Sequence, residues 1–166
     1  MNEFKTISPY ELEGNPFQMI DKQWMLITAG NEEKVNTMTA SWGGLGILWR
    51  KPVNFAFVRP TRYTFEFTER EEYYSLCFFS EEYRDALKLC GTVSGRDRDK
   101  IAECHLTTRY DAEAPYFDEA EIVMICRKMA AQDIDPAGFI DPAVEDCYNN
   151  DYHRVYTGEI IRVLTR

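Results

Sequence analysis

Hydroxyl-bearing and apolar side chains alternate between residues 36 and 42, and this alternation restricts the local backbone to a strand. The hydroxyls belong to Thr37, Thr39 and Ser41, which alternate with Met38, Ala40 and Trp42. Because successive side chains of a strand point to opposite faces, the three hydroxyls are expected on one face. That face is either the solvated side of a half-buried strand or part of a polar ligand site. The glycine-rich residues 43–46 are expected to break the strand.

A second strand is expected over residues 53–58, and it passes without a spacer into Arg59-Pro60-Thr61-Arg62-Tyr63-Thr64. The proline keeps the residue before it extended, and Thr61 is a suitable N-cap for a short helix ending near Thr68. A helix start and two guanidinium groups together favour a phosphate dianion. The sequence therefore predicts an anion site where the strand gives way to the helix, and the alternative is a solvated pair of arginines.

The remaining pattern predicts a mostly β fold. Further strands are expected at residues 24–29, 74–79, 121–126 and 153–164, the last one bent or bulged at Gly158. Helices are expected over 80–90, with Ser80 as cap and Gly91 as stop, and over about 99–104. Residues 1–14 are expected to form an irregular arm. These elements predict one domain over residues 1–166, of the β-barrel class, as a closed or split barrel with short connecting helices.

The composition excludes several classes of partner. The 166 residues carry a net charge of −9 and the pI is about 4.8, which makes nucleic acid and anionic membrane surfaces unfavourable partners. No apolar segment approaches the roughly 18 residues of a membrane span, and the N-terminal residues are too charged for a signal peptide. Five cysteines occur without C-x-x-C spacing. The sequence thus predicts a cytoplasmic protein with reduced thiols.

Other constellations indicate little catalytic chemistry by side chains. The charged loop over residues 94–100 is either a solvated turn or a flexible segment, pivoting on Gly95, that closes over an anion. A dinucleotide fingerprint is excluded because Trp49 stands where Gly44-x-Gly46 would need its third glycine. Two histidines and scattered cysteines predict no metal site, and no catalytic triad can be argued. Chemistry carried by a bound cofactor needs no protein nucleophile.

Four motifs occur in a recognisable order along the chain. They are Asn36-Thr37-Met38-Thr39-Ala40-Ser41-Trp42-Gly43, Val58-Arg59-Pro60-Thr61-Arg62-Tyr63-Thr64, Ser94-Gly95-Arg96-Asp97-x-Asp99-Lys100 and His153-x-x-Tyr156-x-Gly158-Glu159-Ile160. From about Asn15 to the C-terminus, the chain closely resembles the flavin reductase-like FMN-binding proteins, in particular their flavoredoxin-like branch. The resemblance implies a split β-barrel homodimer, with FMN in a groove near the subunit interface.

The resemblance also implies a set of flavin-contacting residues. They are Met38, Thr39, Ala40, Ser41, Trp42, Arg59, Pro60, Thr61, Arg62, Tyr63 and Thr64, with Ser94, Gly95 and Arg96 in a flanking loop. His153 would lie near the flavin edge in an auxiliary role, and no side chain is expected to be catalytic because the flavin carries the chemistry. NADH or NADPH would be a transient electron donor, and a free flavin, a protein or a small molecule would be the acceptor.

Two alternatives stay open at this point. One is an FMN-binding electron carrier without a nicotinamide reaction of its own. The other is a non-catalytic binding or sensing module for a flavin or another phosphorylated ligand.

Overall fold

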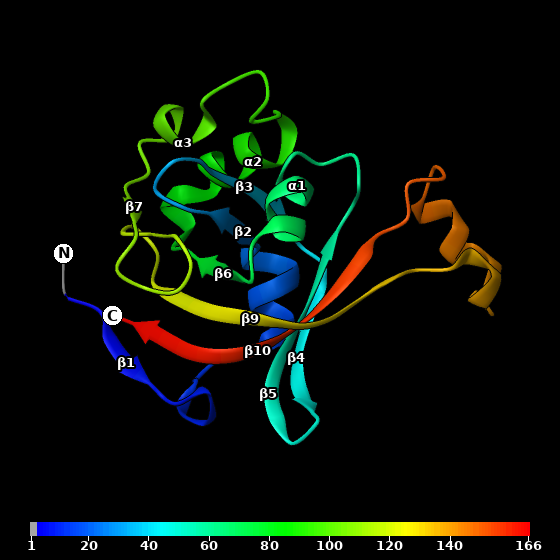
Figure 1. Ribbon diagram of the computed structural model, residues 1–166, viewed down its shortest axis with the longest axis horizontal. Helices are drawn as coiled ribbons and strands as arrows, with labels where there is room; N and C mark the ends of the chain where they lie inside the picture. Colours follow the sequence, from blue (N-terminus) through cyan, green and yellow to red (C-terminus); the bar gives the residue numbers. More distant parts are fainter. Residues whose placement is uncertain (1–2) are drawn as a thin grey trace.

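The computed structural model describes residues 3–166, in which eight strands form one antiparallel sheet (Figure 1). The strands are β1 (Lys5–Ile7), β2 (Met25–Gly30), β3 (Val35–Ala40), β4 (Gly43–Leu48), β5 (Lys51–Val58), β6 (Tyr73–Phe78), β9 (Ile122–Asp133) and β10 (Arg154–Thr165). Their order is β3-β2-β6-β9-β10-β5-β4, and β1 pairs with β10. Within residues 3–166 the sheet is open, because its outer strands β3 and β4 are not paired with each other.

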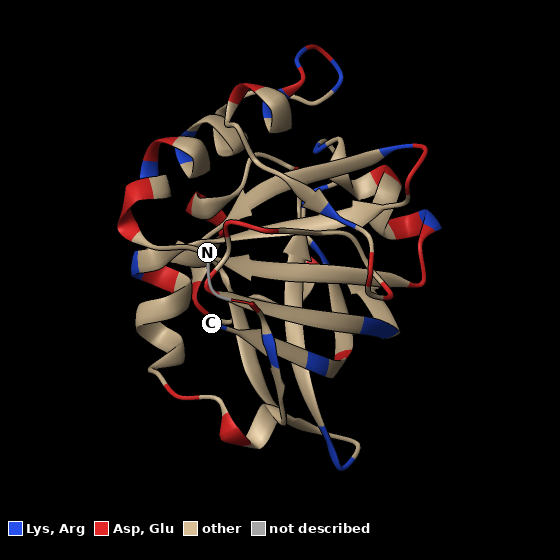
Figure 2. Cartoon of the chain, turned by 90° about the vertical axis from the view of Figure 1, so that its left-hand side faces the viewer, with Lys and Arg blue, Asp and Glu red and all other residues tan. Residues whose placement is uncertain are grey.

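Short helices connect the strands. They are α1 (Thr64–Arg70), α2 (Arg84–Thr92) and α3 (Lys100–Glu103), together with 3₁₀ turns over Pro9–Glu11, Glu81–Tyr83, Pro136–Gly138 and Pro142–Cys147 and a π-helical segment over Gln18–Gln23. A separate two-stranded ladder joins β7 (Thr108–Arg109) to β8 (Tyr116–Phe117). This arrangement confirms the expectation of a mostly β fold with short connecting helices, but not the closed barrel, because the sheet is open over residues 3–166. Charged residues lie mainly on the helices, loops and strand ends (Figure 2).

The sheet separates two apolar cores, because neighbouring residues of its central strands point to opposite faces. On β2, Ile27 belongs to one core and Leu26 to the other. The first core also contains Phe67 of α1, and the second contains Leu87 and Cys90 of α2. The two longer helices therefore pack against opposite faces of the sheet, close to the ends of β2 and β3.

Two expectations about the backbone are corrected. Strand β3 does end before the glycine-rich residues 43–46, at Ala40, but these residues then begin a strand that was not expected, β4, in which Gly43 pairs with Ala56 of β5. A Cβ on Gly43 would lie 3.0 Å from Met25 Cε and 3.2 Å from the Phe55 carbonyl oxygen, so glycine is needed here for close packing. The N-terminal arm is also more regular than expected, since β1 pairs with β10 and a capping box between Ser8 and Glu11 forms the turn that follows.

Two further expectations concern α2 and β10. The predicted helix over 80–90 is a 3₁₀ turn followed by α2, which continues to Thr92. The Ser80 side chain does not cap it but bonds to Glu82. The predicted bulge in the last strand is confirmed, because the pairing of β10 with β9 shifts register between Thr157 and Gly158.

Candidate functional site

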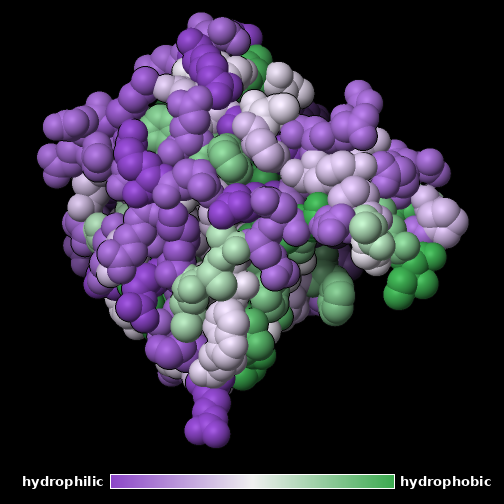
Figure 3. Space-filling model, turned by 45° about the vertical axis from the view of Figure 1, so that its right-hand side comes forward, coloured by the Kyte–Doolittle hydropathy of each residue, from purple (hydrophilic) through white to green (hydrophobic). Residues whose placement is uncertain are grey.

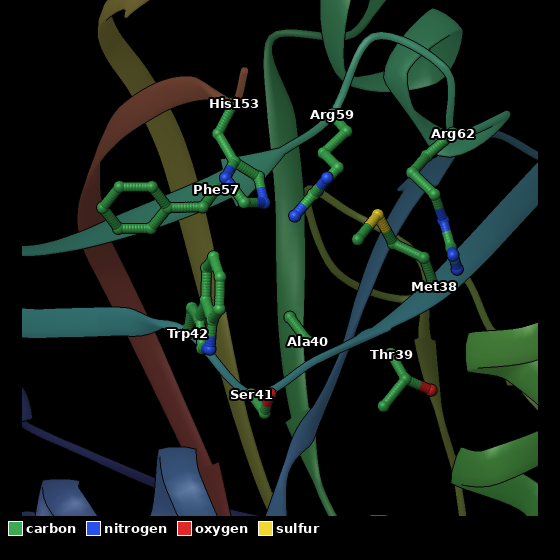
Figure 4. A pocket seen from close by; sticks show the side chains of 9 residues that line it. All are labelled: Met38, Thr39, Ala40, Ser41, Trp42, Phe57, Arg59, Arg62 and His153. Carbon is green, nitrogen blue, oxygen red and sulfur yellow. The ribbon is translucent and has the colours of Figure 1, made fainter. Parts of the chain in front are cut away.

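A cavity of about 170 Å³ lies at the end of β3. Its lining comes from three distant parts of the chain: Met38, Thr39, Ala40, Ser41 and Trp42; Phe57, Arg59 and Arg62; and His153 (Figure 4). The structure thus brings together three of the four sequence motifs. Pro60, Thr61, Tyr63, Thr64, Ser94, Gly95 and Arg96 are not among the residues that line this cavity.

The two arginines reach the cavity from consecutive turns after β5. The amide of Arg62 donates to the Arg59 carbonyl (3.0 Å) and the amide of Phe65 to the Arg62 carbonyl (3.0 Å). The helix begins at Thr64, so the expectation that Thr61 is its N-cap is wrong. The Thr61 hydroxyl instead donates to Asp151 Oδ2 (2.6 Å), which ties this loop to the segment that precedes His153.

Each arginine is held by backbone carbonyls. Arg62 donates from Nη1 to the Gly91 carbonyl (2.9 Å) and from Nη2 to the Cys90 carbonyl (3.4 Å), so it caps the C-terminal end of α2. Arg59 donates from Nη2 to the Cys147 carbonyl (3.0 Å), and its guanidinium lies 5.1 Å from the centre of the Tyr148 ring. These contacts aim both side chains but do not neutralise them.

The two guanidinium charges have no carboxylate counter-ion in the part of the chain that the structure describes. Within residues 3–166, neither Arg59 nor Arg62 forms an ion pair with a carboxylate. Burial, and then the nearby charge of Arg59, lower the pKa of Arg62, so the protonated form is held at a cost. The charge of a bound anion would offset both effects by stabilising the protonated guanidinium. In a chain whose net charge is −9, this cavity is a local positive site.

Most of the predicted hydroxyl face is used by the protein itself. Thr37 is fully buried, and its hydroxyl lies 2.8 Å from the Thr28 hydroxyl and donates to the Ile27 carbonyl (3.1 Å). The Thr39 hydroxyl donates to the Leu87 carbonyl of α2. The face is therefore neither solvated nor free for a ligand at these two positions, because α2 and β2 cover it. Of the three hydroxyls, that of Ser41 alone has no such partner among the described residues.

Thr64 is also occupied, because its hydroxyl accepts a hydrogen bond from Asn36 Nδ2 (2.8 Å). The loop with Ser94, Gly95 and Arg96 packs near the same place, beside α1 rather than along the cavity. A Cβ on Gly95 would lie 2.0 Å from Asn36 Oδ1, and Arg96 pairs with Glu66 while lying 4.6 Å from the centre of the Tyr63 ring.

His153 is buried against aromatic rings at one side of the cavity. Its ring centre lies 5.3 Å from that of Trp42 and 5.9 Å from that of Phe57, and its Nδ1 lies 3.0 Å from the Tyr148 hydroxyl. Burial first, and then the charge of Arg59, lower the pKa of His153 to about 4, with Asp151 opposing them. The imidazole is thus neutral near pH 7.

Sequence reasoning missed Phe57 and Tyr148. Phe57 lies on the predicted strand before Arg59, and the period-2 pattern could have placed it on one face with Phe55. Tyr148 directly follows the second of two 3₁₀ turns and precedes strand β10, in an exposed segment. No sequence periodicity in this segment indicates that the residue contacts the site.

A second, more apolar cavity of about 520 Å³ adjoins the first and shares Ser41, Trp42 and Phe57 with it. The rest of its lining is Pro16, Phe17, Ile20, Asp21, Gly43, Gly44, Leu45 and Tyr148. Together the two cavities reach the size of ordinary cofactor sites. One end presents uncompensated guanidinium groups and the other presents flat aromatic and glycine surfaces. This donor set fits FMN, which combines a phosphate dianion with a planar ring system.

No three His, Cys, Asp or Glu side chains of residues 3–166 are grouped so that they could hold a metal ion. None of the helices in the same range is both long and apolar enough to cross a membrane.

Comparison with known proteins gives a family and a fold. Residues 18–166 match the family model described as flavin reductase like domain. Similar solved structures include flavoredoxin from Methanosarcina acetivorans (21% identity over 87% of this chain and 68% of that chain, TM-score 0.68). Flavoredoxin of Desulfovibrio vulgaris (Miyazaki F) is also similar (20% identity, 86% and 69% coverage, TM-score 0.67). So is an FMN-binding protein from Thermus thermophilus (18% identity, 99% and 80% coverage, TM-score 0.67).

Because the sequence identities to these solved structures are low, the structural likenesses establish a shared fold. No curated protein sequence matches the chain. The family match, by contrast, extends over most of the sequence and contains the motifs at residues 36–43, 58–64, 94–100 and 153–160. The resemblance found in these motifs is thereby confirmed, and the chain belongs to the flavin reductase-like domain family.

Proposed function

We propose that this protein is an FMN-binding redox protein, acting as an NAD(P)H-dependent flavin reductase or as a flavoredoxin-like electron carrier. The proposal rests on one observation. Arg59 and Arg62 lie together beside an apolar groove, and neither has a carboxylate partner among residues 3–166. Family membership supports the same ligand. Flavin-binding residues are therefore proposed at 38–42, 57, 59 and 62, with the Thr39 hydroxyl excluded because it is bonded to the Leu87 carbonyl.

The residues of the groove have separate roles in this proposal. Arg59 and Arg62 hold the phosphate, and the segment from Met38 to Trp42 contacts the ring together with Phe57. Bound FMN supplies hydride and electron transfer, with NADH or NADPH as the proposed donor. Trp42, which lines both cavities and has 45% of its surface exposed, forms one wall of the groove.

His153 is proposed as an auxiliary residue rather than an acid. Its Nδ1 is engaged by the Tyr148 hydroxyl, and its lowered pKa keeps the ring uncharged near pH 7. It therefore adds no positive charge beside Arg59, and it presents Nε2 as its remaining polar atom. Tyr148, which also lies under the guanidinium of Arg59, fixes the orientation of both side chains.

A flavin titration tests the phosphate site directly. We expect Arg59→Ala to weaken FMN binding by the 1.5–3 kcal/mol of a charged hydrogen bond, or roughly 10- to 150-fold. Riboflavin, which lacks the phosphate, should bind to both proteins with similar affinity. Arg50→Ala is the matched control, because it removes the same charge from the turn between β4 and β5, at the other end of β5. Equal FMN affinity of Arg59→Ala and the parent protein would refute the site.

Steady-state oxidation of NADH and NADPH in the presence of FMN separates the two redox roles. Flavin-dependent consumption of either nucleotide supports the reductase, whereas consumption of neither supports the carrier. A protein that rejects FMN but binds another phosphate ester would instead be a binding or sensing module without redox chemistry.

We further propose a split-barrel homodimer. The segment between β9 and β10, residues 134–153, extends away from the sheet (Figure 1) and carries Ile140 with 99% of its surface exposed. Apolar surface also gathers beneath it on the face shown in Figure 3. A second copy of the chain would cover this surface. Light scattering coupled to size exclusion should give twice the monomer mass, and Ile140→Asp should shift the equilibrium toward the monomer.

A further inference from the structure

Two cysteine thiols lie next to each other on the side of α2 that faces α3. The sulfur of Cys90, in α2, is 3.9 Å from the sulfur of Cys104, the residue that ends α3. Cys90 is buried and Cys104 is partly exposed. A disulfide has a sulfur–sulfur bond of about 2.05 Å, so the two atoms need to approach by roughly 2 Å.

The backbone on both sides of this pair is held in place. The Cys90 carbonyl accepts hydrogen bonds from Lys100 Nζ (2.9 Å) and from Arg62 Nη2 (3.4 Å). Lys100 also donates to the Val93 carbonyl (3.1 Å) and is the first residue of α3, so it fastens α3 to the end of α2. The short distance between the sulfurs is thus built into the packing of the two helices, and Cys104 is the more exposed of the two thiols.

We infer that Cys90 and Cys104 form a reversible disulfide, a redox-modification site for a peroxide oxidant. The inference does not depend on the proposed flavin function. Neither thiol belongs to the cavity residues, and a failure to bind FMN would leave it standing. The sequence predicted that all five cysteines are reduced and structural. The inference instead assigns a joint chemical role to two of them.

The reaction is a balanced two-electron oxidation. The partly exposed thiolate of Cys104 attacks one oxygen of hydrogen peroxide, the O–O bond breaks, and the other oxygen leaves as hydroxide, which takes up a proton to form water. The Cys90 thiol then attacks the sulfur of the resulting sulfenic acid, the S–O bond breaks, and a second water leaves. Two thiols and one peroxide thus give one disulfide and two waters, and a dithiol reductant reverses the modification by exchange.

Burial sets the conditions under which this reaction is expected. It raises the pKa of the Cys90 thiol to about 12 and also raises the pKa of Cys104. Thiolate is therefore scarce at neutral pH, so the site should respond to millimolar peroxide over minutes to hours and not to trace amounts.

Trypsin separates the two cysteines cleanly, which makes peptide mapping the decisive experiment. Cleavage after Lys88, Arg96, Lys100 and Arg109 gives one peptide of residues 89–96 with Cys90 and another of residues 101–109 with Cys104. The Cys147→Ser variant is used throughout, because Cys147 is exposed and could link two chains. After millimolar peroxide and alkylation of remaining thiols, the two peptides should appear as one species two hydrogens lighter than their sum.

Dithiothreitol should restore both free peptides, and Cys104→Ser in the same background should abolish the linked species without a new link to Cys77 or Cys126. Two results overturn the inference. One is recovery of both peptides with free thiols after the treatment, and the other is oxidation of Cys104 to sulfinic acid while Cys90 stays free. Both are read from the protein with both thiols intact, so poor folding of the Cys104→Ser variant would not hide them.

Discussion

The low proton affinity of His153 has a measurable consequence for stability. Only 7% of the surface of this residue is exposed, and burial followed by the charge of Arg59 lowers its pKa from 6.5 to about 4. The unfolded chain therefore takes up a proton at a higher pH than the folded protein does. This contribution to stability is complete above pH 6.5 and is lost as the pH falls through about 4.

The size of the effect follows from the two pKa values. The difference between pKa 6.5 and about 4 corresponds to at most roughly 3.4 kcal/mol, because one pKa unit is 1.36 kcal/mol. At pH 4.5 the expected loss relative to pH 7.5 is up to roughly 2.5 kcal/mol. Urea unfolding of the parent and of the variant His153→Gln at pH 4.5 and pH 7.5 isolates the contribution of His153. Protonation of carboxylates destabilises the two proteins alike and cancels in the comparison.

Nuclear magnetic resonance measures the same pKa directly. The chain has two histidines, His105 and His153, so labelled histidine gives two ring signals and the variant His105→Gln assigns the one from His153. Arg59→Met should raise the midpoint of His153 but leave it below 6.5, because burial is the larger cause. A midpoint at or above 6 in the parent protein would refute the reasoning.

Three further predictions concern packing around the site. Thr39→Val should lower the free energy of unfolding by about 1 kcal/mol while leaving FMN affinity within twofold, because the hydroxyl is bonded to the Leu87 carbonyl; a tenfold loss of affinity in a flavin titration would contradict this. Gly95→Ala should lower the melting temperature by several degrees, since its Cβ would lie 2.0 Å from Asn36 Oδ1; an unchanged melting curve would be the contrary result. Burial lowers the pKa of Lys100 to about 8, so the parent protein should gain stability relative to Lys100→Met between pH 8 and 10 in urea unfolding; parallel curves would exclude the effect.

Local patterns were sufficient to predict the strands that build the site. The alternation over residues 36–42 and the apolar run before Arg59 placed β3 and β5 correctly, because both signals depend on side chains a few residues apart. The bulge at Gly158 was also predictable from one residue. The common site for Met38 to Trp42 and the two arginines was implied by the resemblance of the motifs to a known family and not by these local signals, and the structure places these residues along one cavity.

The rest depended on contacts between distant segments. Strand β4 was missed because its glycines carry no alternating pattern, and it exists through pairing with β5. The Thr61 hydroxyl donates its hydrogen bond to Asp151, which is ninety residues away in the sequence. No local signal in the sequence distinguishes this contact from that of an N-cap. The hydroxyls of Thr37 and Thr39 face β2 and α2 for the same reason: the sequence indicates that they share a face but not what covers it.

Arg62 both lines the cavity and caps α2, and this double role affects how its variants can be interpreted. The guanidinium that reaches the cavity also completes the carboxyl end of α2. An Arg62 variant that binds its ligand less tightly will therefore also have a frayed end of α2. A measured loss of affinity alone cannot show whether the missing ligand contact or the frayed helix causes it. Selection for folding and selection for binding act on the same atoms, so this position should tolerate substitution less than Arg59 even in a protein kept without ligand.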